Sequence, residues 1–295
     1  MKPAGNVGIV VLNYLNYWDT VECVKSSLKL KSSNYKIVVV DNGSNNKSYE
    51  ILKSKFAKNK KVIVIRSEIN LGFAKGNNIG IAYARENLKC NYVFCINNDT
   101  VFTDLEILSK LLSCYREGYG VIGPKITGKD GKNQNPIPTG ITYKKLIRDL
   151  VFSAVFSIID IETLKSNYLI SKYLSTKKLL KKKLKSKKSS PIILHGSAIM
   201  FTPDFFEKYS GFYPGTFLYY EENILAVILT KINLKTLYCS KAGIYHKEDK
   251  SSELSFGNIS RKKSRLQFKS ILRCLLIKLL PFIIIKRRDE SPLMS

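Results

Sequence analysis

Short, almost continuously apolar segments alternate with amphipathic segments over the N-terminal part of the chain. The apolar segments are too short for typical helices and rich in β-branched residues, which indicates buried strands. The predicted strands are Val7–Leu12, Lys36–Val40, Val62–Ile65 and Tyr92–Ile96. Helices are predicted over Asp19–Leu30 and Ser48–Phe56, and again from the residues after Asn78 through Ala84 to Asn87. This alternation predicts an α/β fold, in which helices cover both faces of a mostly parallel sheet.

Polar residues follow three of these predicted strands. They are Asn13-Tyr14, Asp41-Asn42-Gly43-Ser44 and Asn97-Asn98-Asp99. Because parallel strands share one direction, these residues should meet at one edge of the sheet, where open α/β sheets bind ligands. A carboxylate such as Asp99 at that edge suits a divalent cation that carries phosphate. The alternative is a plain turn, since Asn-Asn-Asp is also good turn chemistry.

Asp41, Gly72 and Gly76 each allow two interpretations. Asp41 could accept hydrogen bonds from a base or ribose, or it could cap the next helix. The two glycines could let the backbone approach a phosphate or sugar closely, or they could simply make a turn. The chain has neither a Walker loop nor a GxGxxG fingerprint, so it lacks the motifs that mark kinases and Rossmann dehydrogenases.

Four motifs in order resemble those of the family 2 glycosyltransferases, which have the GT-A fold. They are Val10–Tyr14, Val39–Ser44, Asn70–Asn78 and Asn97–Asp99. The resemblance covers about residues 5–125, returns at about 192–250, and points to the branch with bacterial rhamnosyltransferases and similar surface-polysaccharide enzymes. The combined match is specific for the family but not for the sugar.

The resemblance implies a role for individual residues of the N-terminal half. The implied donor-binding residues are Asn13, Tyr14, Asp41, Gly72, Gly76, Asn77 and Asn98. Asn97-Asn98-Asp99 stands where the family has its Asp-X-Asp motif, with Asn in place of the first carboxylate. Asp99 is then the principal carboxylate on Mg²⁺ or Mn²⁺.

The second matching region implies the acceptor site. A strand with a glycine break is predicted over Ile192–Phe201, and a helix begins at Phe205 and ends at Gly211-Phe212. Glu221-Glu222 precedes the apolar helix Ile224–Leu229. The family places its catalytic base here, so Glu222 matches the base and Glu221 its partner. Ile224 stands where the family often has a further acid, and the alternative is a pair of surface carboxylates capping a helix.

The resemblance also implies that His246, in a loop after the run Leu234–Tyr245, completes the metal shell or touches the diphosphate. A structural role is the alternative for this residue and for His195. The Cys residues mostly lie in apolar surroundings and are interpreted as buried thiols of a reducing cytosol, without a disulfide framework. They are Cys23, Cys90, Cys95, Cys114, Cys239 and Cys274.

The net charge of +26 implies an acidic partner. Apolar residues lie near helical spacing from Lys144 to Tyr173, and Lys177–Lys188 is mostly lysine with interleaved leucines. Such a basic helix can lie on an anionic membrane surface, although a solvated lysine face is the alternative. Nucleic acid is not expected as a partner, because no binding module accompanies the lysines.

The C-terminal apolar run Ile271–Ile285 has basic flanks and is short for a spanning helix. An amphipathic helix at the membrane interface fits it better, and a helix packed on the core is the alternative. No apolar signal segment precedes the first strand, so a cytoplasmic protein, peripherally bound to the inner face of the cell membrane, is expected.

These observations predict an inverting hexosyltransferase of family 2 that uses a UDP- or dTDP-sugar, with dTDP-rhamnose as one candidate. The acceptor would be a saccharide or a lipid-linked saccharide in bacterial cell-surface polysaccharide biosynthesis. The predicted organisation is a donor half (1–125), a loop and basic helical insert (126–190), an acceptor half (191–255) and a membrane-associating tail (256–295).

Two rival functions remain at this stage. A nucleotidyltransferase would need a Gly-rich loop bearing Lys or Arg, which Gly8–Tyr14 lacks. A basic RNA-binding protein is favoured by net charge alone.

Overall fold

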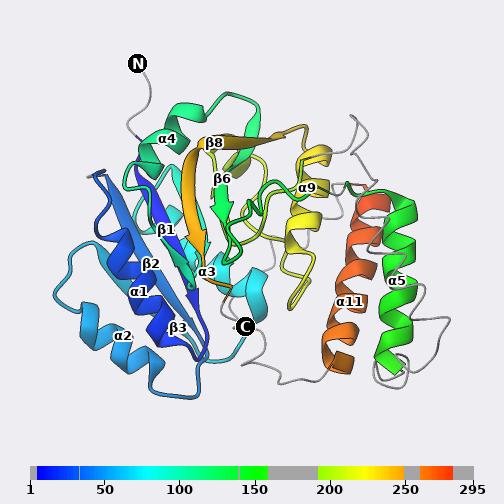
Figure 1. Cartoon of the computed structure of the whole chain (residues 1–295), viewed down its shortest axis with the longest axis horizontal. Coiled ribbons are helices and arrows are strands. Elements are labelled where there is room, and N and C mark those ends of the chain that lie inside the picture. Colours follow the sequence, from blue (N-terminus) through cyan, green and yellow to red (C-terminus); the bar gives the residue numbers. More distant parts are fainter. Residues whose placement is uncertain (1–4, 33, 139, 159–191, 249–259, 282–295) are drawn as a thin grey trace.

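A computed structural model describes residues 5–32, 34–138, 140–158, 192–248 and 260–281. The lysine-rich segment Lys177–Lys188, on which the first membrane prediction rests, lies outside the described residues. Figure 1 shows a central sheet with helices on both faces and a pair of helices, α5 and α11, at one end.

The sheet has eight strands in the order β3-β2-β1-β4-β7-β6-β8-β5. The neighbouring pairs among β1 to β4 are parallel, β7 runs antiparallel to both β4 and β6, and β6 and β8 are parallel. The strands are β1 (Val7–Asn13), β2 (Tyr35–Asn42), β3 (Val62–Ser67), β4 (Tyr92–Asn97), β5 (Thr100–Val101), β6 (Tyr119–Thr127), β7 (Ala198–Phe201) and β8 (Lys235–His246). The predicted mostly parallel α/β sheet is confirmed.

Helices pack on both faces because successive side chains of a strand point to opposite sides. Val10 of β1 faces a core that contains Ile81 of α3, whereas Val11 faces a second core that contains Leu52 of α2. The helices of the described chain are α1 (Tyr17–Ser27), α2 (Ser48–Phe56), α3 (Gly72–Glu86), α4 (Ile107–Cys114), α5 (Tyr143–Ile158), α8 (Pro203–Phe206), α9 (Glu221–Lys231) and α11 (Ser260–Leu279).

The largest differences from the sequence predictions are at three boundaries, whereas α1, at Tyr17–Ser27, and the first strands shift by at most three residues. Gly72–Asn78 forms the first turns of α3 rather than a loop before it. β7 begins only at Ala198, and Ile193 makes an isolated bridge with Ile137. The helix expected from Phe205 to Gly211-Phe212 is the short α8, which begins at Pro203 and ends at Phe206.

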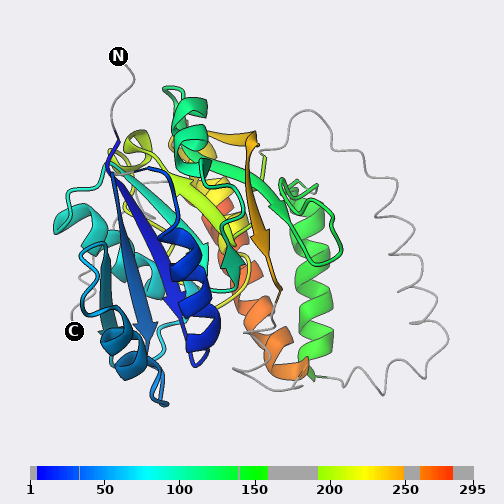
Figure 2. The ribbon, with the colours of Figure 1, turned by 60° about the vertical axis from the view of Figure 1, so that its left-hand side comes forward.

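The C-terminal helix α11 packs along α5 and against α9 (Figure 2). Its side chains Ile271, Cys274 and Ile277 are buried in the core that also contains Leu146 of α5. Within the described residues, no helix combines the length and apolar character needed to cross a bilayer.

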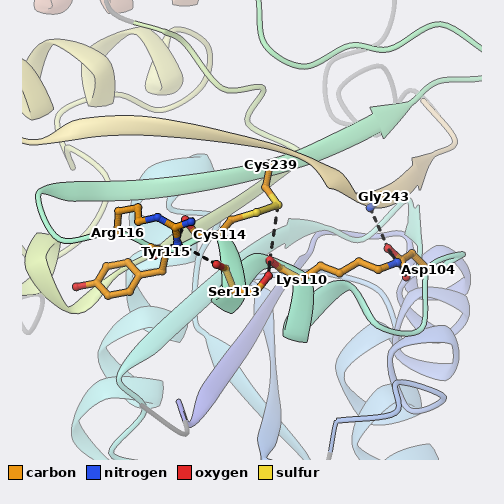
Figure 3. The surroundings of a disulfide bond; sticks show 8 residues. All are labelled: Asp104, Lys110, Ser113, Cys114, Tyr115, Arg116, Cys239 and Gly243. Carbon is orange, nitrogen blue, oxygen red and sulfur yellow. Dashed lines mark hydrogen bonds and ion pairs between the residues drawn. A yellow bond between two sulfur atoms is a disulfide. The ribbon is translucent and has the colours of Figure 1, made fainter. Parts of the chain in front are cut away.

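Two cysteines correct the interpretation that the chain has only free thiols. Cys114 at the end of α4 and Cys239 in β8 form a disulfide, with their Cα atoms 6.2 Å apart (Figure 3). They are 125 residues apart in sequence, and they meet because α4 packs on β8. The other four cysteines, as predicted, are buried free thiols.

Candidate functional site

A buried polar network lies at the carboxyl ends of β1, β2 and β4. Asn13 Nδ2 donates to Asp41 Oδ2 at 2.7 Å, and Asn13 Oδ1 accepts from Thr20 Oγ1 of α1 at 2.7 Å. Asn98 Nδ2 in turn donates to Thr20 Oγ1 at 3.1 Å. The predicted meeting of Asn13, Asp41 and Asn98 at one edge is therefore found, with Thr20, which the motifs did not single out, at its centre.

Asp41 also orders the backbone of its own turn. Its Oδ1 accepts from the backbone N of Ser44 at 3.0 Å, and the whole residue is inaccessible to solvent. Tyr14, next to Asn13, is half-buried at the same edge. Contact of Asp41 and Tyr14 with a nucleoside stays a prediction, and the hydrogen bonds show that Asp41 has a structural role as well.

The predicted donor residues of α3 are held by protein contacts. Gly72 has φ +81°, and a side chain there would collide with the backbone of Phe217, whose carbonyl accepts from Phe73 N at 2.8 Å. A Cβ at Gly76 would lie 2.7 Å from Leu12 Cδ1 of β1. Asn77 is buried and donates to the carbonyl of Phe73 at 2.9 Å. The contact at Gly76 sets how closely α3 approaches the sheet, and donor binding by the three residues stays a prediction.

The pairing of β5 with β8 brings Asp99 to His246. Thr100, the first residue of β5, is the register partner of His246, and the backbone N of Lys247 donates to the carbonyl of Asp99 at 2.9 Å. His246 Nε2 lies 3.2 Å from Asp99 Oδ1, and both side chains are buried. His246 is thus the last residue of a strand rather than part of a loop, which corrects its predicted position.

Gln134, in the loop after β6, determines which nitrogen of His246 faces Asp99. Gln134 Nε2 donates to Glu248, and a carboxylate can only accept, so the amide oxygen of Gln134 must face His246. That oxygen lies 2.9 Å from His246 Nδ1. Both ring nitrogens of His246 thus face oxygen atoms, and a cation bound between His246 and Asp99 would need the imidazole proton on Nδ1, toward Gln134, and the lone pair on Nε2. No motif marked Gln134, because its partner His246 is 112 residues away.

The acidic pair opens α9 directly after two strained residues. Tyr219 and Tyr220 have φ values of 78° and 68°, in the left-handed region that costs about 1–3 kcal/mol for each such residue. Tyr220 Oη donates to Asp149 Oδ2 of α5 at 2.8 Å. The first turn of α9 then places Glu221 and Glu222 where the helix dipole favours negative charge.

The two glutamates have different environments. Glu221 is buried, and this burial together with the neighbouring Glu222 raises the pKa of Glu221 to about 8. Burial also raises the pKa of Glu222, while the positive charge of Lys145 on α5 acts to lower it. Glu222 is half-buried, less completely than Glu221. At neutral pH, Glu221 therefore holds a proton, and Glu222 is the carboxylate of the pair that solvent can reach.

A loop ahead of β7 joins the acidic pair to the Asp99–His246 pair. Glu222 Oε2 lies 3.8 Å from the position that a Cβ on Gly196 would take. The next residue, Ser197, accepts through its carbonyl from Asn97 N at 3.0 Å. The preceding residue, His195, has its ring centroid 5.5 Å from that of His246. Burial, assisted by the nearby His246, lowers the pKa of His195 to about 4, so its ring is neutral at neutral pH.

Asp99 and His246 fit a divalent cation as a pair of ligands. A carboxylate oxygen of Asp99 and the imidazole Nε2 of His246 lie 3.2 Å apart, and Mn²⁺ accepts both carboxylate and imidazole as ligands. In the described part of the chain, no group of three or more His, Cys, Asp or Glu side chains could hold a metal ion. A divalent cation held by two protein ligands commonly takes oxygens of a bound phosphate group and water as further ligands.

The comparisons with known proteins agree with this architecture. A curated relative, the low-salt glycan biosynthesis hexosyltransferase Agl10 of Haloferax volcanii, is 25% identical over 143 residues. The match covers 48% of this chain and 44% of that protein, so it spans less than half the length of the relative.

Two solved structures share the fold. The mannosyltransferase PcManGT of Pyrobaculum calidifontis, in complex with GDP-Man and Mn²⁺, has a TM-score of 0.56 at 11% identity, over 97% of this chain and 73% of that one. GalNAc-T7 with UDP, GalNAc and Mn²⁺ has a TM-score of 0.54 at 15% identity, over 84% of this chain and 44% of that one. At these identities the likeness shows the fold, the GT-A type of α/β sheet.

The family is shown by the sequence itself. Residues 7–203 match the family described as Glycosyl transferase family 2, and they include the network around Asn13 and the turn that carries Asp99. The match covers more than half of the chain. This protein belongs to glycosyl transferase family 2.

Proposed function

We propose that this protein is an inverting hexosyltransferase that moves a sugar from a nucleotide-diphosphate donor to a hydroxyl of a saccharide or lipid-linked saccharide. The observation that carries the proposal is that the loop 195–197 lies beside both groups: Gly196 is next to Glu222, and His195 is next to His246 of the Asp99–His246 pair. The turn between β4 and β5 supplies the carboxylate that would bind the cation, and the first turn of α9 supplies the base.

In this mechanism Glu222 accepts the proton of the acceptor hydroxyl as its oxygen attacks the anomeric carbon. Direct displacement inverts the configuration at that carbon, and no covalent intermediate on the protein is needed. Asp99 and His246 would hold Mg²⁺ or Mn²⁺, which stabilises the negative charge of the departing diphosphate. Glu221, which is protonated at neutral pH, adds no negative charge beside the base.

We further propose a uridine or thymidine diphosphate donor, with dTDP-rhamnose as one candidate, and a role in bacterial cell-surface polysaccharide biosynthesis. The protein would act in the cytoplasm, peripherally bound to the anionic inner face of the cell membrane. The UDP and GDP-Man of the two structural neighbours support a nucleotide-diphosphate donor.

A thermal-shift panel tests donor binding. UDP-, dTDP- and GDP-sugars are each added with and without Mn²⁺, and a ligand that binds only the native state must raise the melting temperature. We expect a shift of a few degrees for one nucleotide class that grows when Mn²⁺ is present. If folded protein shows no shift with any donor, the proposed function is contradicted.

Replacing Gln134 by Leu should weaken Mn²⁺ binding about tenfold, since loss of a partner that orients a metal-binding histidine typically costs that much. The leucine cannot accept from His246 Nδ1–H, so Nε2 is no longer held toward Asp99. The apparent Mn²⁺ affinity is measured by titration in the presence of the nucleoside diphosphate that gives the largest thermal shift.

Lys132→Leu is the matched control, because this exposed residue lies in the same loop and contacts Asp130 instead. It should keep the wild-type affinity. Unchanged Mn²⁺ affinity in Gln134→Leu would show that Gln134 does not orient His246.

A further inference from the structure

Helix α5 presents an apolar surface outward over its whole length. Tyr143, Ile147, Val151 and Val155 recur at every fourth residue, which places them on one side of the helix. They are 45%, 52%, 57% and 40% exposed, and Ile158 at the end of the helix is 76% exposed. The opposite side is packed, because Leu146 and Ser153 are buried. The outward side of a helix on the surface of a water-soluble protein is normally polar, so this apolar side needs an explanation.

The last turns of α11, which packs along α5, also carry exposed apolar side chains. Leu272, Leu276 and Leu279 are 36%, 38% and 61% exposed. Lys278 Nζ lies 4.9 Å from the ring centroid of Tyr143, so the end of α11 adjoins the start of α5. The two helices run side by side in both views (Figures 1 and 2). We call the exposed apolar residues of both helices the α5–α11 surface.

The charge on these helices is almost entirely positive. α5 carries Lys144, Lys145 and Arg148, and its single acidic residue, Asp149, is engaged by Tyr220. α11 carries seven further basic residues and no acidic one. They are Arg261, Lys262, Lys263, Arg265, Lys269, Arg273 and Lys278.

We propose that the α5–α11 surface docks the protein on an anionic membrane surface, with the apolar side chains among the lipid headgroups. Exposed apolar residues beside basic ones on a helix match the chemistry of an anionic bilayer interface. A nucleic acid would pair with the lysines and arginines but would leave the apolar residues in water, so charge complementarity alone does not account for this surface.

Helix α5 also contacts the acceptor side of the candidate site, so docking through α5 would affect where the acceptor binds. Asp149 of α5 accepts from Tyr220, and Tyr220 directly precedes the acidic pair. Docking through α5 would therefore hold Glu222 close to the membrane surface. This favours a lipid-linked acceptor over a free saccharide, an inference that rests on the proposed function for the role of Glu222.

Vesicle binding by the full chain tests the proposal without any donor present. Wild-type protein should float with vesicles that contain phosphatidylglycerol, release from them at high salt, and bind phosphatidylcholine vesicles far more weakly. Val151→Glu should weaken binding to the anionic vesicles about tenfold. It removes apolar area that docking would bury in the membrane, and it adds a negative charge that the anionic lipids repel. Ile69→Glu changes a residue that is 65% exposed outside the surface, and it should bind as the wild type does.

A second variant tests the proposal independently, in case Val151→Glu does not fold. Arg273→Glu, on α11, should also weaken binding to anionic vesicles at an unchanged melting temperature. The proposal is overturned if the wild type does not bind anionic vesicles, or if both variants bind as tightly as it does. It is also overturned if Val151→Glu lowers the melting temperature by several degrees while vesicle binding persists, because another part of the protein then covers α5.

The thermal-shift panel separates this proposal from the function. Val151→Glu should keep the wild-type shift with donor and Mn²⁺ while it loses vesicle binding. If the wild-type protein binds vesicles but no donor, the proposed function is contradicted and the docking proposal is still supported.

Discussion

Glu222→Gln should lower kcat for sugar transfer about a thousandfold, because an amide cannot accept the proton of the acceptor hydroxyl. The donor should still bind, since the proposed role of Glu222 is to deprotonate the acceptor, so the thermal shift with donor and Mn²⁺ should not change. Transfer is followed with a radiolabelled form of the donor that the panel identifies, and an acceptor-containing membrane fraction receives the sugar.

Glu221→Gln is the matched control for this substitution. The pKa of Glu221 is about 8, so its side chain is neutral at neutral pH and an amide of the same shape imitates it. Its effect on kcat should stay within about tenfold, well below the loss of a general base. Near-wild-type turnover in Glu222→Gln would remove Glu222 from the mechanism.

The pH profile provides a second readout of the same role. Because burial raises the pKa of Glu222, the base becomes protonated as the pH falls through values above the usual range of a glutamate. The transfer rate of the wild type should therefore decrease as the pH is lowered, and the rate of Glu221→Gln should decrease over the same pH range. A profile that is flat down to the ordinary pKa of glutamate would contradict the assignment.

Asp99→Asn should abolish the Mn²⁺-dependent part of the thermal shift and lower transfer about a thousandfold. The substitution removes the negative charge that faces His246 Nε2, and a neutral amide oxygen is a much weaker ligand for a divalent cation. The fold should remain, because the replacement has nearly the same shape and the turn after β4 keeps its backbone contacts.

Circular dichroism and the melting temperature without ligand check that the Asp99→Asn variant is folded. Asp130→Asn serves as its control, because this carboxylate lies in an exposed loop and pairs with Lys132. The control should respond to Mn²⁺ as the wild type does. A full Mn²⁺ response in Asp99→Asn would place the cation elsewhere.

Local sequence patterns were sufficient for the N-terminal part of the fold, from β1 to β4. The four buried strands, the helices α1 and α2, and the meeting of Asn13, Asp41 and Asn98 at one edge all follow from periodicity and from the common direction of parallel strands. The motif residues that match the family lie within these short segments, and each motif can be identified without knowledge of distant contacts.

Contacts between distant residues needed the tertiary structure. The sequence interpretation missed the Cys114–Cys239 disulfide and placed His246 in a loop, because both depend on how β8 pairs and packs. Thr20 and Gln134 carry no motif of their own, and they become informative only through partners 78 and 112 residues away.

The sequence by itself determined the fold class, the family and the candidate carboxylates, since each depends on residues that are neighbours along the chain. Only the tertiary structure decided which nitrogen of His246 faces Asp99, and that the loop 195–197 lies beside both Glu222 and His246. It also decided which side of α5 is left exposed. The physical reason is that hydrogen-bond partners and burial are set by packing between segments that local periodicity does not relate.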